Sequence, residues 1–139
     1  MGEPISLASG LLTLATFAFQ SSITLYDTIK SFHSHLRRVC DLIEELEALS
    51  NVLGPLIDIV DNNTDTDLSA LKLPLLRCGN ACKDFETELL KCSSRSSDSR
   101  TSFRDWARLR YMGDDVDGFR RLVAGYKLTI NIALTDANL

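Results

Sequence analysis

The residues best able to do chemistry in this chain are its four cysteines and two histidines. Cys78 and Cys82 lie one helical turn apart, and two thiolates on one helix face can bind a metal ion when other ligands converge on them. The histidines, at positions 33 and 35, would face different sides of a helix. The cysteine spacing also fits a simpler explanation, because a free cysteine behaves as a small buried hydrophobe. We therefore expect thiols in a core, and neither a metal site nor a cofactor.

Patterns typical of enzymes are missing from the sequence. It has no Gly-x-Ser-x-Gly elbow, no Gly-x-x-x-x-Gly-Lys phosphate loop and no Gly-x-Gly-x-x-Gly turn. The glutamates of residues 44–47 form a charge run of the kind that usually lies on a solvated helix face. The aspartates of residues 61–67 resemble part of a calcium loop without its glycine and closing glutamate. We expect no catalytic residues and no enzymatic activity.

The element that opens the chain carries no charged side chain from Pro4 to Tyr26, between Glu3 and Asp27. Its length matches the roughly 20 apolar residues of a membrane-spanning helix, but eight serine, threonine and glutamine residues interrupt it. The acidic start argues against a secretory signal. We expect a hydrophobic helix that begins at Pro4, which suits a first turn, and ends between residues 31 and 35. It is either buried in a bundle or buried in one state and lipid-facing in another.

Three further long helices are predicted from apolar residues at spacings of three and four. In the second helix, Gly54-Pro55 predicts a kink or an interruption. The third helix should begin near Pro74, and the last should begin with the acidic residues 114–115, which suit the positive end of the helix dipole. The predicted core faces contain Leu42, Leu46, Leu49, Leu53, Leu56 and Val60; then Leu75, Cys78, Cys82, Phe85, Leu89 and Cys92; then Phe119, Leu122, Val123, Tyr126, Ile130, Ala133, Leu134 and Ala137.

A basic and aromatic segment precedes the last helix. Residues 102–111 predict a short helix, and residues 91–110 are locally basic. The chain as a whole has a net charge of −4, and this negative charge argues against nucleic acid as a general partner. An amphipathic indole ring suits a lipid headgroup layer or a protein interface. In the opposing interpretation the ring packs on the bundle and the arginines are solvated. The candidate lipid or partner contacts are Arg104, Trp106, Arg108 and Arg110.

These elements predict an all-α fold, a helical bundle of four main helices plus the short basic-aromatic helix. A chain of 139 residues can bury about two-thirds of its unfolded surface, so we expect one domain over residues 1–139. The last apolar pattern continues to Leu139, from which we expect a fragment of a longer polypeptide. Because no export signal is present, four cysteines indicate a reducing, cytoplasmic location. Thiol titration of the denatured, non-reduced protein should then find four free thiols.

The opening residues, Glu-Pro-Ile-Ser-Leu-Ala-Ser-Gly-Leu-Leu-Thr-Leu-Ala at positions 3–15, resemble the start of HeLo-like N-terminal domains of filamentous-fungal proteins. The second helix, the segment around Trp106 and the closing Leu128–Leu134 are also similar to that family, so the resemblance covers essentially the whole chain. The family implies an N-terminal domain of a STAND (NOD-like) receptor, related to the HeLo and HELL domains of fungal incompatibility and, more remotely, to the executioner bundle of the necroptosis pseudokinase.

In those relatives, oligomerisation frees an N-terminal hydrophobic segment that attacks the membrane and causes cell death. The resemblance places this role on residues 5–25, and its candidate membrane-active side chains are Ile5, Leu7, Leu11, Leu12, Leu14, Phe17 and Phe19. The eight polar residues make insertion as an isolated span marginal. If the role holds, replacing both Leu11 and Leu14 with glutamate should abolish membrane activity.

Two functions therefore stay open. In the first, the domain is a signalling and effector module that relocates to anionic membrane lipids when it is clustered by downstream domains of the same chain. In the second, it is a non-lytic adaptor that self-associates or recruits a protein by helix packing, and its first helix never leaves the core. The state of the first helix on clustering distinguishes them.

Overall fold

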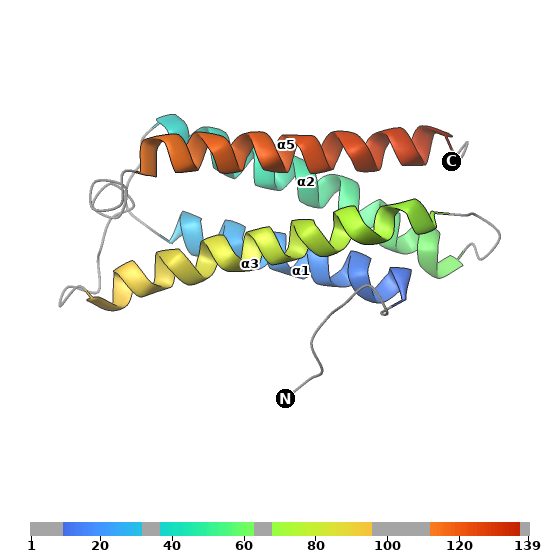
Figure 1. Ribbon diagram of the computed structural model, residues 1–139, viewed down its shortest axis with the longest axis horizontal. Helices are drawn as coiled ribbons and strands as arrows, with labels where there is room; N and C mark the ends of the chain where they lie inside the picture. Colours follow the sequence, from blue (N-terminus) through green and yellow to red (C-terminus); the bar gives the residue numbers. More distant parts are fainter. Residues whose placement is uncertain (1–9, 32–36, 63–67, 96–111, 137–139) are drawn as a thin grey trace.

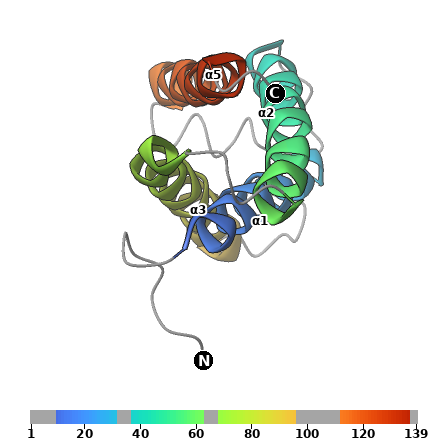
Figure 2. The same cartoon turned by 90° about the vertical axis from the view of Figure 1, so that its right-hand side faces the viewer.

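The computed structural model describes residues 10–31, 37–62, 68–95 and 112–136, and these form a bundle of long α-helices (Figures 1 and 2). The helices are α1 (Leu11–Lys30), α2 (Arg37–Asn62), α3 (Lys72–Arg95) and α5 (Met112–Asp136), and a short 3-10 turn, η1 (Ser69–Leu71), leads into α3. Every element in these ranges is helical, which confirms the all-α prediction. The predicted short helix over residues 102–111 lies outside them.

The four helices surround one core. Seen end-on, α1 and α5 lie on opposite sides, with α2 and α3 between them (Figure 2). α1 packs extensively on both α2 and α3, whereas α5 packs mainly on α2 and more lightly on α3. The first helix therefore has two neighbours along its length, and its outer side is not covered by another of these helices.

The stripe of leucines on α2 is the centre of the core. Leu42, Leu46, Leu49, Leu53 and Leu56 are each fully buried, as their spacing predicts. Burying such a side chain stabilises the fold by roughly 1.5–3 kcal/mol. Only the last member of the predicted stripe, Val60, is half-buried, because it lies near the end of the helix.

The start of α1 differs from the prediction. The helix begins at Leu11 and not at Pro4, because Gly10 has extended backbone angles (φ −68°, ψ 162°) and acts as the N-cap. Its carbonyl accepts the first helical hydrogen bond, from the Leu14 amide at 3.0 Å. Glycine costs about 1 kcal/mol inside a helix but is accepted at an N-cap. Ile5 and Leu7 consequently precede the helix and lie outside the described residues.

Of the kink or interruption predicted at Gly54-Pro55, the interruption does not occur, since α2 continues through Pro55 to Asn62. Pro55 is exposed on the side of α2 away from the leucine stripe. Its ring leaves the carbonyl one turn earlier, on Asn51, without a helical donor, and Asn51 is exposed as well. Water can satisfy that carbonyl, while the buried leucines on the opposite side hold the helix together.

The last helix contacts the others through a narrower face than predicted. Val116, Phe119, Val123 and Ile130 are buried, and the ring of Phe119 stacks on Phe85 of α3 with centroids 4.3 Å apart. An ion pair between Lys127 Nζ and Glu45 Oε1, 3.0 Å long, joins α5 to α2. Leu122, predicted to be in the core, is 43% exposed. The error arises because α5 packs mainly on one helix, so residues at the edge of its stripe stay in water.

Candidate functional site

The predicted membrane-active residues do not lie on one face of α1. Leu14 is fully buried against the bundle, Leu11, Phe17 and Phe19 are half-buried, and Leu12 is 38% exposed. The buried side of the helix otherwise carries small residues beside two larger ones: Ala15, Ala18, Ser22, Leu25 and Ile29.

The outer side of α1 is an uncharged surface. We call it the α1 face, and define it as Leu12, Thr13, Thr16, Phe17, Gln20, Ser21 and Thr24, which are exposed or half-buried. No ionisable group occurs in α1 before Tyr26. Because 24% of the chain is charged, an exposed helix surface of this length without a charged residue is unusual. It suits contact with a surface that offers little charge of its own.

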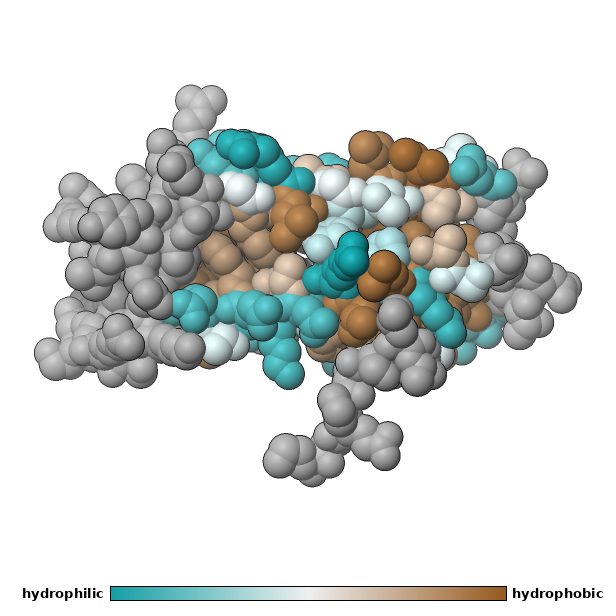
Figure 3. All heavy atoms as spheres, viewed as in Figure 1, coloured by the Kyte–Doolittle hydropathy of each residue, from teal (hydrophilic) through white to brown (hydrophobic). Residues whose placement is uncertain are grey.

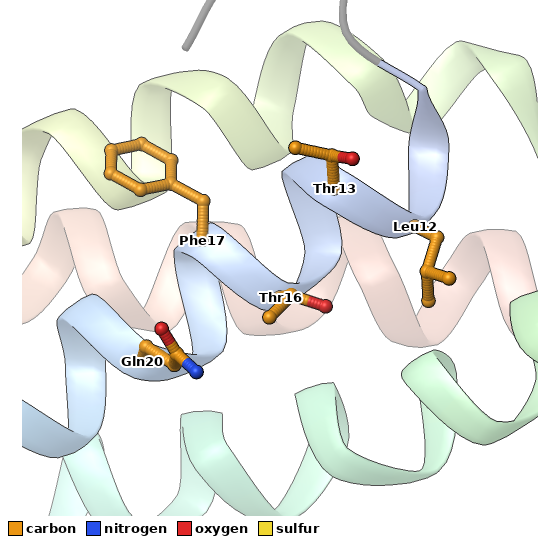
Figure 4. A pocket seen from close by; sticks show the side chains of 5 residues that line it. All are labelled: Leu12, Thr13, Thr16, Phe17 and Gln20. Carbon is orange, nitrogen blue, oxygen red and sulfur yellow. The ribbon is translucent and has the colours of Figure 1, made fainter. Parts of the chain in front are cut away.

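Two shallow hollows lie along the α1 face. The larger, about 390 Å³, is lined by Leu12, Thr13, Thr16, Phe17 and Gln20 (Figure 4). The second, about 240 Å³, lies between α1 and α3. Phe17 and Gln20 line both, so the two hollows adjoin. The lining of the second adds Ser21 and Thr24 from α1 with Lys83 and Glu86 from α3.

The chemistry of these hollows is that of a contact surface. Hydroxyl, amide and apolar groups alternate along α1, and the charged side chains Lys83 and Glu86 of α3 line the second hollow on its other side. Thr28 Oγ1 donates a hydrogen bond of 2.7 Å to Glu86 Oε2, which occupies that carboxylate at the boundary between the two helices. Such a surface can bind an apolar or weakly polar partner, for example another helix.

The ring of Phe17 lies against α3 (Figure 4). It covers Gly79, which is buried, and a Cβ added to Gly79 would overlap the ring. On the other side of α1, Phe19 lies over Gly54 of α2, where an added Cβ would be 3.8 Å from the ring. The glycines thus allow aromatic side chains of α1 to lie close to both neighbouring helices, and this long-range fit is not visible in the local sequence pattern.

The two ends of α1 are held differently. At the C-terminal end, polar contacts add to the packing: Thr28 bonds to Glu86, and Lys30 Nζ lies 5.1 Å from the centre of the Tyr26 ring. At the N-terminal end, Gly10 provides no side-chain cap. Helix ends without a side-chain cap fray more readily, so α1 is expected to open from Leu11 rather than from Lys30.

Cys78 and Cys82 on α3 are core residues, as predicted. Both are buried, Cys40 is half-buried, and none of the three forms a disulfide. A hydrogen bond with Cys78, together with burial, raises the pKa of the Cys82 thiol well above its usual value. Burial likewise raises the pKa of Tyr126. Within the described ranges no three metal-ligating side chains come together. His33 and His35 lie outside those ranges, and the side chain of Cys92 is not described.

The raised pKa of Cys82 predicts a loss of stability at alkaline pH. The neutral thiol is favoured in the folded protein, so its contribution is complete below the unfolded pKa of about 8.5 and is lost as pH rises through the higher folded value. We expect the free energy of unfolding from urea titrations to decline from about pH 8.5 upward. A variant with alanine at both 78 and 82 should show a smaller decline over pH 8.5–10. An equal decline in both proteins would contradict the assignment.

The other predicted contacts, Arg104, Trp106, Arg108 and Arg110, lie outside the described residues, so the structure does not bring them together with α1. In the described part of the chain, no helix has the length and apolar character needed to cross a membrane. In α1, the threonines, serines and glutamine lower the apolar character of the helix below what a membrane span needs.

The fold and the α1 face define a class: all-α bundle domains whose first helix presents an uncharged surface. The chain belongs to the family described as pigment biosynthesis cluster protein PigL N-terminal, whose model matches residues 2–139. This is a family of fungal HeLo-like domains, so the resemblance seen in the sequence is confirmed at that level. No curated protein and no solved structure matches the chain.

Proposed function

We propose that this domain is the N-terminal signalling and effector domain of a fungal NOD-like receptor (STAND) protein. Clustering by downstream domains activates it, and α1 then acts at an anionic membrane to which the protein relocates from the cytoplasm. The observation that carries the proposal is the arrangement of α1. Its inner side is buried against α2 and α3, and the α1 face on its outer side carries no charged residue and is exposed or half-buried.

The energetics explain why clustering is needed. Leu14, Leu25 and Ile29 are buried, and removing each from the core costs roughly 1.5–3 kcal/mol. A single copy therefore keeps α1 docked. Several copies held together can replace the lost contacts with each other and with lipid. In such an assembly the threonine and glutamine side chains can face one another while leucine and phenylalanine face lipid.

The direct test of this proposal is dye leakage from anionic liposomes, with the protein free and clustered through its C-terminus. We expect leakage on clustering only, and a strong loss of it in Leu12→Glu. Leu12 is already 38% exposed, so the folded bundle should tolerate the change. A charged side chain in a membrane costs about 2.5–3.5 kcal/mol, or about a hundredfold in occupancy.

The matched control is Leu73→Glu on α3, where the leucine is 39% exposed, and it should leave leakage unchanged. Leu11 and Leu14, chosen from the sequence, are a poor pair for this purpose. Glutamate at the fully buried Leu14 would disrupt the bundle and would confuse loss of fold with loss of function. If clustered, folded wild-type protein releases no dye, the effector role fails.

The second candidate function is a non-lytic adaptor. The hollows beside Phe17 and Gln20 are already open in the docked state, so a partner helix can bind there while α1 stays in place. Hydrogen exchange of the clustered protein separates the two functions. An effector should lose amide protection in α1 on clustering, whereas an adaptor should keep it.

A further inference from the structure

The outer side of α5 is a second exposed surface that carries no role in the proposal above. Leu128 is 60% exposed and Ile132 is 52% exposed, and Gly125 between the turns has open space where a Cβ would be. Hydrophobic atoms lie along the upper edge of the molecule near the C-terminal end of α5 (Figure 3). Spacings of four, three and four place Arg121, Gly125, Leu128 and Ile132 on one stripe. We call this stripe, with Asp136 at its end, the α5 face.

We propose that the α5 face binds the α5 face of a second copy of this chain, with the two helices antiparallel. In a two-fold pair centred between residues 128 and 129, the two Leu128 side chains meet. At the same level along the helices, Ile132 of each copy lies over Gly125 of the other. The face thus carries both a protruding side chain and the notch that receives it, which a two-fold interface requires of a single surface.

The charges of this surface are complementary in the same register. From Leu122 to Thr135 the only charged residue is Lys127, and it pairs with Glu45 of α2. Arg121 and Asp136 are exposed at the two ends of the stripe, equally far from its centre. The antiparallel pairing therefore places Arg121 of each copy beside Asp136 of the other. A parallel pairing would instead place like charges together.

The expected pair is weak. The stripe spans 16 residues, or about 24 Å of helix, and one helix face of that length buries less than the roughly 800 Å² per partner of a stable complex. Pairing should thus become extensive at high local concentration. It goes beyond the proposed function, because it needs neither a membrane nor a released α1.

Charge exchange tests the register. By sedimentation equilibrium at rising concentration, we expect the wild type to approach the mass of a dimer. Arg121→Asp and Asp136→Arg should each weaken association at least about tenfold, and an equimolar mixture of the two variants should restore it, because each then meets an opposite charge. A wild type that stays monomeric at about 1 mM would overturn the proposal. The proposal would also be overturned if the mixture of variants associated no more tightly than either variant alone. Binding of the α5 face to vesicles, without association of two copies, would overturn it as well.

Leucine substitutions at two glycines test the proposed contact at Gly125. Both Gly118 and Gly125 have open space around an added Cβ, so leucine at either position should fold, as circular dichroism would verify. Gly125→Leu should abolish pairing because it fills the place of Ile132 of the second copy. Gly118→Leu, two turns earlier, should retain it. Equal association of the two variants would exclude this register. Failure here leaves the leakage experiment unaffected, so the two proposals fail separately.

Discussion

Replacing Leu14 with alanine should lower the free energy of unfolding by about 2–5 kcal/mol, the range for a fully buried leucine. The same change at Leu12 should cost less than about 1 kcal/mol. The difference follows from position: Leu14 is fully buried against the core, and Leu12 is 38% exposed on the α1 face. Urea titrations of the two variants beside the wild type measure both values.

This comparison also decides how α1 is held in the free protein. A large effect at Leu14 means that the helix is docked in solution. The effector function requires this, because α1 must stay in the core until the protein is clustered. If Leu14→Ala and Leu12→Ala cost the same small amount, the helix is not docked, and the energy barrier that we assign to its release does not exist. Mutations on α2, such as Leu49→Ala, would still be strongly destabilising in that case, because Leu49 is fully buried.

The fold was predictable because regular spacing dominates it. The leucines of α2 repeat at intervals of three and four, and so does the set Leu75, Cys78, Cys82, Phe85 and Leu89 of α3. Such a stripe must face a core whatever the neighbouring helices are. The errors concern features that depend on those neighbours. Pro55 is tolerated because its side of α2 faces water, and Leu122 is exposed because α5 packs mainly on α2.

The candidate site was predictable only in part. The absence of charge marked the segment that holds most of α1, but composition alone does not distinguish the buried Leu14 from the exposed Leu12. Two residues, or about 200° of rotation, separate them around the helix, and packing decides which of the two faces the core. Gly10 was a usable signal for the start of α1, since glycine is accepted at an N-cap. On α5, Leu128 and Ile132 stand four residues apart off the core stripe, which was the available sign of a second apolar surface.

The contact between Phe17 and Gly79 predicts that one substitution will have opposite effects at two glycines. Alanine in place of an exposed helical glycine stabilises by about 0.5–1 kcal/mol, and we expect this gain for Gly125→Ala, where the added Cβ meets nothing. At Gly79 the Cβ overlaps the Phe17 ring, and overpacking of this kind costs about 1–3 kcal/mol. Gly79→Ala should therefore destabilise the protein in the same urea titration.

Removal of the ring provides the control. In a Phe17→Ala background the overlap is gone, so Gly79→Ala should there become neutral or stabilising, and the double-mutant cycle should give a coupling of at least about 1 kcal/mol. If Gly79→Ala stabilises the wild type as much as Gly125→Ala does, the ring does not rest on α3 in solution. Since Phe17 lines both hollows of the α1 face, that result would also remove the surface on which the adaptor function depends. A strong coupling would instead fix the ring as the link between α1 and α3, the contact that release of α1 must break.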